Sequence, residues 1–166
     1  MKIRPAAQAD RPRILEILIG TARFSQQEIG WAMDLVDAAI DHSGKSEYQV
    51  YVLDSPDSGP SRMAQGYVCF GPTPRSEGVY DLYWIAVDPR HQGQGLGQLL
   101  LRFVENEVRR ERGRMLLIET SSKKSYAPTI RFYRQAGYEE ISRIKDFYRI
   151  EDDKVVFCKT LAQPGS

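Results

Sequence analysis

The sequence predicts an α/β protein with a mixed sheet flanked by helices, and two observations support this fold class. Strand-like and helix-like stretches follow one another in the order strand, two helices, three strands, helix, strand, helix and two strands. With 42% hydrophobic and 27% charged residues, the 166-residue chain fits one compact domain around one core. We expect a single domain over residues 1–161 and a flexible tail at 162–166.

The first part of the chain predicts one short strand and two helices. Residues 1–4 are typical of a strand, and Asp10 is placed to cap a helix whose apolar residues follow helical spacing at Ile14, Leu15, Leu18 and Ile19. Ser25 and Glu28 form a capping-box pattern, which predicts a second helix that ends near Asp41.

The middle of the chain predicts three strands. Residues 48–53 and 63–70 are β-prone, and a turn rich in Pro, Gly and Ser lies between them at 55–61. These two strands are expected to pair as a hairpin. Residues 79–87 form a third β-prone run, which the Asp-Pro pair at 88–89 terminates.

The last elements alternate between helix and strand. A helix is predicted from about Gly95 to Arg112, with Gly113 as its C-terminal cap. Beyond it the sequence predicts a strand, a helix and two closing strands, at residues 115–120, 128–136, 138–143 and 154–161.

Charge and cysteine content exclude several classes of partner. The 23 basic and 22 acidic side chains leave a formal net charge of +1, so no global field favours nucleic acid or an anionic membrane. No stretch reaches the roughly 18 apolar residues of a membrane span and no signal-peptide pattern is present, which predicts a cytoplasmic protein. Cys69 and Cys158 lie in apolar strand-like runs, so we expect reduced core thiols, and no pattern predicts a metal site.

A glycine-rich segment is the strongest indication of chemistry. Residues 92–97, Gln-Gly-Gln-Gly-Leu-Gly, lie between a strand end and an amphipathic helix. Their unhindered backbone N–H groups can approach an anion at the positive end of the helix, and a pyrophosphate is the natural occupant. The alternative is a turn whose glycines only let the helix and strand pack closely.

A dinucleotide fold is a rival explanation of the same segment. It also places a glycine loop between strand and helix, and an acid, here Glu119, at the end of the following strand. Two features oppose it: the third glycine of Gly-x-Gly-x-x-Gly is missing, and five residues, 88–92, separate the strand from the first glycine. We therefore expect no specific binding of NAD.

Two spaced motifs resemble the GNAT acetyltransferase superfamily. Its acetyl-CoA motif, Gln/Arg-x-x-Gly-x-Gly/Ala after a strand with a Val-Asp-Pro-like end, corresponds to Ile-Ala-Val-Asp-Pro at 85–89 followed by residues 92–97. Its later pattern, an aromatic pair followed by Gly-Phe or Gly-Tyr, corresponds to Phe-Tyr-Arg-Gln-Ala-Gly-Tyr at 132–138. The order of elements also matches that family, so the resemblance covers nearly the whole chain.

The resemblance implies a GNAT-type, mostly antiparallel sheet of about seven strands with about four helices, splayed in the middle to hold CoA. It implies acetyl-CoA as co-substrate, with the acetyl carbonyl near the backbone N–H of Ile85. Tyr126 stands where the family usually has an asparagine, which is a departure from its pattern. The cofactor-binding residues implied are Ile85, Ala86, Val87, Gln92, Gly93, Gln94, Gly95, Leu96, Gly97, Gln98, Tyr126 and Tyr133.

An alkylamine acceptor needs a base, because a pKa near 10.4 leaves only about one part in a thousand neutral at pH 7. Asp81 alternates with Tyr83 and Ile85 along one strand and, by the resemblance, matches a position where several members have a glutamate base. The shorter Asp81 would act through a water; the alternative is a solvated or arginine-paired carboxylate. Tyr133 matches the family tyrosine that can protonate the departing thiolate, and its alternative is plain packing.

The resemblance also implies where the acceptor amine binds. It would lie against the two early helices and the final hairpin, with Phe24, Trp31, Tyr83 and Phe147 as substrate-binding residues. Acids at 151–153 in the expected loop 146–153 would attract a cationic amine or only solubilise the turn. The predicted function is acetyl transfer to a small-molecule, amino-acid or protein amine by a monomer or homodimer. The alternative is a non-catalytic acyl-CoA-binding module.

Overall fold

The computed structural model describes residues 1–42, 46–56 and 63–161. The predicted tail at 162–166 and residues 57–61 of the predicted turn lie outside the described residues. The elements follow the predicted order: β1 (Lys2–Pro5), α1 (Arg11–Gly20), α2 (Gln26–Asp41), β2 (Gln49–Asp54), β3 (Ala64–Pro72), β4 (Val79–Val87), α3 (Leu96–Arg110), β5 (Met115–Ser121), α4 (Ala127–Gln135), β6 (Glu139–Arg149) and β7 (Asp152–Thr160).

The strands form one seven-stranded sheet in the order β1-β2-β3-β4-β5-β7-β6. Strands β1 with β2, β2 with β3, β5 with β7 and β6 with β7 pair antiparallel. The parallel ladder of β4 with β5 joins Val79–Leu82 to Met115–Ile118. This mixed, mostly antiparallel sheet with its four α-helices confirms the predicted fold class.

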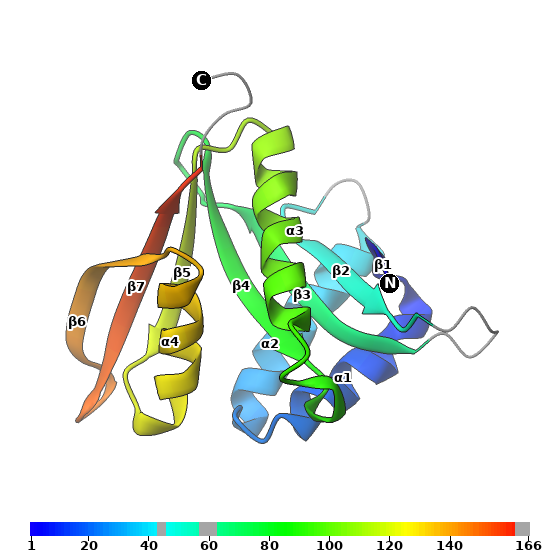
Figure 1. Cartoon of the computed structure of the whole chain (residues 1–166), viewed down its shortest axis with the longest axis horizontal. Coiled ribbons are helices and arrows are strands. Elements are labelled where there is room, and N and C mark those ends of the chain that lie inside the picture. Colours follow the sequence, from blue (N-terminus) through cyan, green and yellow to red (C-terminus); the bar gives the residue numbers. More distant parts are fainter. Residues whose placement is uncertain (43–45, 57–62, 162–166) are drawn as a thin grey trace. The chain divides into compact units, whose positions relative to one another are not determined.

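The chain divides into two compact units, and the division passes through β4 and α3. The first unit comprises Met1–Gly71 and Tyr83–Val104, and the second comprises Pro72–Leu82 and the chain from Glu105 onward. Figure 1 shows the course of the chain through β1, α1, α2, β2 and β3 in blue to green and through β5, α4, β6 and β7 in yellow to red. The single domain over 1–161 stays a prediction.

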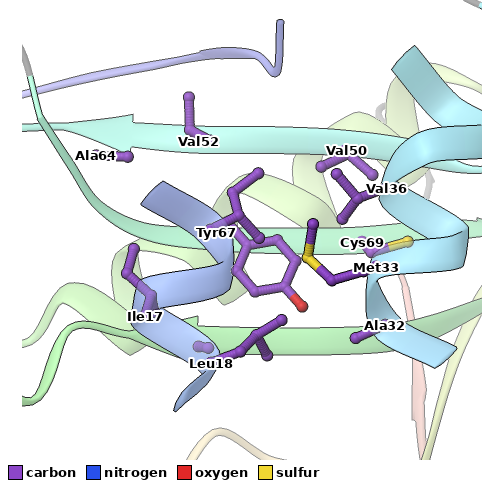
Figure 2. Packing of buried hydrophobic residues seen from close by; sticks show 12 residues of the cluster. Ile17, Leu18, Ala32, Met33, Val36, Val50, Val52, Ala64, Tyr67 and Cys69 are labelled. Carbon is purple, nitrogen blue, oxygen red and sulfur yellow. The ribbon is translucent and has the colours of Figure 1, made fainter. Parts of the chain in front are cut away.

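In the first unit, helices α1 and α2 cover one face of β2 and β3. Successive side chains of a strand point to opposite faces, so every second side chain of β2 and β3 points toward these helices. Val50 and Val52 of β2 and their partners in β3, Cys69 and Tyr67, form this face of the core. On the opposite face, the ring of Tyr51 lies 4.8 Å from that of Phe103 in α3. The side chains that α1 and α2 contribute to the core include Ile17, Leu18, Ala32, Met33 and Val36 (Figure 2).

Of the two caps predicted at helix N-termini, one is confirmed and the other is wrong. At the start of α2 the Glu28 N–H donates to Ser25 Oγ (3.2 Å) and the Ser25 N–H donates to the Glu28 carboxylate (2.7 Å), which completes the capping box. Asp10 precedes α1 but makes no cap hydrogen bond to it. Its carboxylate accepts instead from the Arg4 guanidinium (2.7 and 2.8 Å) and the Ala7 N–H (2.8 Å). A charged bidentate partner is a stronger donor than a helix N–H.

Removing the hydroxyl of Tyr67 is expected to stabilise the protein. Tyr67 is fully buried in the core between α1 and α2 (Figure 2), and its hydroxyl has no hydrogen-bond partner among the described residues. Because an unsatisfied buried hydroxyl costs about 1–3 kcal/mol, Tyr67→Phe should raise the free energy of unfolding by about 1 kcal/mol in urea denaturation. A loss of stability would instead reveal a bound partner, such as a buried water.

In the second unit, one face of β5 and β7 packs against α4. Ile118 is paired with Phe157, and both side chains are buried. The Phe157 ring lies 6.1 Å from the ring of Tyr133 in α4. The sheet and α4 thus meet through aromatic contacts that enclose Tyr133.

The hairpin of β6 and β7 is longer than predicted, and the expected loop at 146–153 is wrong. Strand β6 continues to Arg149 and β7 begins at Asp152. The Asp153 carboxylate accepts from the Asp146 N–H (3.0 Å) and from Arg143 (3.1 Å), which joins the two strands close to the turn. These side-chain bonds between the strands extend the hairpin, so Asp153 stabilises the turn.

Candidate active site

The predicted phosphate-binding loop follows β4 directly. Pro89–His91 form one 3₁₀ turn, and Asp88 caps it by accepting the Arg90 N–H (3.0 Å). Gly93 and Gly95 have φ angles of +75° and +78°, and a Cβ at either position would meet no atom within 4 Å. Both glycines are therefore required by backbone conformation, and both border open space.

A run of unpaired backbone donors makes this loop suited to an anion. None of the N–H groups from Gly93 to Gln98 donates a hydrogen bond to another described residue; the next, that of Leu99, donates to the Gly95 carbonyl (3.0 Å). These donors lie where the 15-residue helix α3 begins, at the positive end of its dipole. Six adjacent N–H groups, open space at the glycines and a helix N-terminus together fit a pyrophosphate.

Asp88 anchors the loop through a buried charge network. Its carboxylate, 2% exposed as a residue, accepts from Arg13 of α1 and from the Arg90 side chain (2.8 and 3.1 Å). The hydrogen bonds from Arg90 and the charge of Arg13 hold the pKa of Asp88 well below its usual range. Arg13 also donates to the Ala64 carbonyl (2.9 Å), so the network joins the loop to α1 and β3.

Replacing Asp88 with asparagine is expected to destabilise the protein in a pH-dependent way. The variant removes the buried carboxylate partner of the half-buried Arg13 and leaves it, among the described residues, only the exposed Glu16 (3.0 Å), so the free energy of unfolding at pH 7 should fall by about 3 kcal/mol. Because the folded pKa of Asp88 is depressed, its contribution is present above the unfolded pKa of about 3.9 and is lost as pH falls further. Urea denaturation of both proteins should therefore give a constant difference from pH 5 to 8 that shrinks below about pH 4. A difference independent of pH would contradict this assignment.

The other predicted cofactor residues of the first unit lie at the end of β4 and the start of α3. Ile85 and Val87 are half-buried and Ala86 is buried, while Gln92, Gln94 and Gln98 are exposed and Leu96 is buried. The Gln92 side chain donates to the Val87 carbonyl (3.1 Å), which ties the loop to the strand. The contact of the Ile85 N–H with an acetyl group stays a prediction.

Tyr133 lies in the second unit, within a buried aromatic cluster. It is 4% exposed, and its ring lies 6.0 Å from Tyr138 and 6.1 Å from Phe157. Burial raises the pKa of Tyr133 well above its usual value, so the phenol stays protonated at neutral pH. Its hydroxyl donates to no other described residue. Both the packing and the acid interpretations are therefore compatible with its surroundings.

Asp81, also in the second unit, is a half-buried carboxylate in β4. It accepts a hydrogen bond from Thr73 Oγ1 (2.7 Å), and no arginine pairs with it among the described residues. Burial raises its pKa, the Thr73 hydrogen bond opposes this, and the nearby Glu119 and Lys154 act in opposite directions. The arginine-paired alternative is thus wrong, and the role of Asp81 as a base stays a prediction.

The four predicted acceptor residues do not form one cluster within either unit. In the first unit, Phe24 packs edge-on against Trp84 (5.0 Å between centroids), and Tyr83 packs likewise against Tyr48 (5.4 Å). Trp31 is 56% exposed on α2. In the second unit, Phe147 lies under the Lys154 ammonium, 4.8 Å from its ring centroid. Sequence reasoning did not identify Trp84 and Tyr48 as the packing partners of Phe24 and Tyr83, although the aromatic pair at 83–84 was visible in the sequence.

Several residues from rival explanations have ordinary structural roles. Glu119 forms an ion pair with Lys154 (2.9 Å). Cys69 and Cys158 are buried free thiols, as predicted, and burial raises both pKa values, that of Cys69 to about 12. Tyr126 precedes α4 as its N-cap residue. Within the described ranges there is no cluster of three potential metal ligands and no helix long and apolar enough to cross a membrane.

Comparisons with known proteins agree with the fold. A profile of the acetyltransferase (GNAT) domain matches residues 46–140. A candidate acetyltransferase of the GNAT family from Desulfovibrio desulfuricans is 38% identical, with a TM-score of 0.90 over 97% of this chain and 99% of its own. The S-alkylcysteine N-acetyltransferase of Bacillus subtilis is 28% identical over 82% of this chain and 77% of its own.

A second curated relative matches over a shorter stretch. The N-alpha-acetyltransferase RimI of Mycobacterium tuberculosis is 31% identical over 48% of this chain and 46% of its own, so the match spans about half of that relative. The domain profile covers strands β2 to β5, helix α4, and the glycine loop and helix α3 whose geometry fits a pyrophosphate. On these grounds the chain belongs to the GNAT acetyltransferase family.

Proposed function

We propose that the protein is an acetyl-CoA-dependent N-acetyltransferase that acts on a primary amine by direct attack in a ternary complex. One observation carries the proposal: the six successive N–H groups from Gly93 to Gln98 without an acceptor, at the start of α3. They supply a binding site for the pyrophosphate of acetyl-CoA, which anchors the thioester-bearing arm. The arm would run along the backbone of β4 near Ile85, where an N–H can stabilise the developing oxyanion.

In the proposed reaction, the amine nitrogen attacks the thioester carbonyl carbon and the carbon–sulfur bond breaks. The nitrogen loses a proton to Asp81, directly or through a water, and the acetyl group becomes an amide. The electron pair of the broken bond leaves on the CoA sulfur. Tyr133, which stays protonated because burial raises its pKa, transfers its proton to that sulfur as the bond breaks, which gives the CoA thiol, and regains a proton from solvent.

Replacing Asp81 with asparagine is expected to lower kcat about 100-fold at pH 7, because general-base catalysis contributes roughly 10²–10⁴-fold. The deficit should shrink as pH rises toward the acceptor pKa near 10.4, since more amine is then neutral. The raised pKa of Asp81 means that wild-type activity rises with pH through a value above the ordinary aspartate range. Steady-state rates of CoA release across pH measure both effects.

Thr73→Val provides the matched control for Asp81. It removes a hydrogen bond that lowers the Asp81 pKa, so the acid limb of the rate profile should move to higher pH while activity remains. A profile that moves in neither variant would exclude Asp81 as the base.

The relatives guide the choice of acceptors for a first screen. The names of two of them, an S-alkylcysteine N-acetyltransferase and an N-alpha-acetyltransferase, both describe acetylation of nitrogen. We therefore propose amino acids, including S-alkylcysteines, and the N-terminal amines of short peptides as the first compounds to test, followed by alkylamines.

Calorimetric titration with acetyl-CoA, with NAD as control, tests the binding half of the proposal before an acceptor is known. Saturable micromolar binding of acetyl-CoA alone is expected; no binding would leave the glycine loop with a structural role only. The amine screen then tests turnover through CoA release. Binding without turnover on any class of amine would favour the acyl-CoA-binding module over the enzyme.

A further inference from the structure

A buried charge cluster in the second unit lies behind Tyr133 and is not used by the reaction above. Glu105 of α3 is 5% exposed as a residue. Its Oε1 accepts from the Tyr138 hydroxyl (3.1 Å) and from the Lys159 ammonium of β7 (2.9 Å). Its Oε2 lies 3.6 Å from the Arg109 guanidinium. Two hydrogen bonds and an ion pair thus compensate the buried charge of Glu105.

The cluster binds two carbonyls at the end of α4, those of Tyr133 and Ala136. Lys159 donates a second hydrogen bond, to the Ala136 carbonyl (2.9 Å) just beyond the helix. The Tyr138 N–H donates to the carbonyl of Tyr133 itself (3.0 Å), and the Tyr138 ring lies 6.0 Å from the Tyr133 ring. Tyr138 therefore holds Tyr133 by backbone and ring, while its own hydroxyl is fixed by Glu105.

We propose that Glu105, Tyr138 and Lys159 form a clamp that positions the Tyr133 phenol for its role at the CoA sulfur. The role at the CoA sulfur rests on the proposed function. The orientation that the clamp gives to the Tyr133 side chain does not depend on catalysis. The three residues are positioning residues: Tyr138 contacts the Tyr133 carbonyl and ring, Lys159 contacts the Ala136 carbonyl at the end of α4, and Glu105 binds both Tyr138 and Lys159. Their effect on turnover should therefore pass through the Tyr133 hydroxyl alone.

A double-mutant cycle tests this dependence. Glu105→Gln and Tyr138→Phe should each lower kcat about 10-fold, with the KM for acetyl-CoA changed less than about twofold. In a Tyr133→Phe background neither change should lower kcat further. Glu107→Gln, on the same helix but paired with Arg110 at 2.7 Å on the surface, is the matched control and should leave kcat unchanged. Equal losses in both backgrounds, or an unchanged kcat in the single variants, would overturn the clamp.

A second readout separates failure of the clamp from failure of the proposed function. With 3-fluorotyrosine placed at position 133, fluorine NMR should show one narrow line in the otherwise wild-type protein and a broadened or doubled line in Glu105→Gln and Tyr138→Phe. If these NMR lines were observed in a protein that transfers no acetyl group, the clamp would be supported and the proposed reaction would be rejected. A single unchanged line in both variants would reject the clamp whatever the activity. Because Tyr138→Phe keeps the ring contact, it remains informative if Glu105→Gln fails to fold.

Discussion

Gly95→Trp is expected to abolish measurable acetyl-CoA binding, a loss of at least about 100-fold in affinity, or roughly 2.7 kcal/mol. The φ of +78° at Gly95 and the open space beside it place a tryptophan side chain where the pyrophosphate would approach the N–H groups of the loop. The bulky ring would both fill the site and strain the left-handed backbone. Calorimetric titration of the purified variant measures the loss directly.

Two controls separate filling of the site from strain and from bulk. Gly95→Ala introduces the same left-handed strain with little volume, so it should retain a substantial part of the affinity. Gly30→Trp adds the same bulk at an exposed position of α2 where a Cβ meets no atom within 4 Å, and it should leave acetyl-CoA affinity unchanged. If Gly95→Trp bound acetyl-CoA as tightly as Gly30→Trp, the anion site would have to lie elsewhere.

Tyr133→Phe is expected to lower kcat about 100-fold while the KM for acetyl-CoA changes little, because the hydroxyl acts on charge that develops only in the transition state. The phenylalanine ring preserves the contacts with Tyr138 and Phe157. Since the Tyr133 hydroxyl donates to no other described residue, its removal should not lower the melting temperature. Steady-state kinetics and a thermal melt of the same preparation check both statements.

The same substitution at Tyr80 is the matched control for Tyr133. Its hydroxyl donates to the Glu111 carboxylate (2.7 Å) in the same unit, so Tyr80→Phe should cost about 1 kcal/mol of stability. Its kcat should equal that of the wild type. An undiminished kcat in Tyr133→Phe would remove the proposed role at sulfur and leave Tyr133 as a packing residue.

Local sequence was sufficient for the features that depend on neighbouring residues. The capping box of Ser25 and Glu28 was predictable because both partners lie within one helical turn. The glycine loop was predictable because closely spaced glycines mark a backbone that adopts left-handed φ values, as Gly93 and Gly95 do. The order of strands and helices followed from periodicity, and with the two spaced motifs it was enough for the fold class and the family.

The cap predicted for Asp10 shows where that reasoning ends. A helix N-cap is a local pattern, but the Arg4 guanidinium, which also binds Asp54 from β2 at 2.9 Å, takes the Asp10 carboxylate. The length of the β6–β7 hairpin was likewise set by bonds between strands. Competition between a distant charged group and a local hydrogen-bond partner depends on which charges the fold brings together. The spacing of residues in the sequence does not predict it.

The sequence by itself determined the order of elements, the glycine loop between β4 and α3 and the residue types available for chemistry. Only the tertiary structure decided what surrounds them: Arg13, 75 positions from Asp88, anchors the loop, and Lys159, 54 positions from Glu105, completes the cluster behind Tyr133. The physical reason is that burial and charge pairing, which shift the pKa values of Asp81, Asp88 and Tyr133, arise from contacts between distant segments. Helical and strand periodicity report only which face of an element is apolar, not which ionised group will lie opposite it.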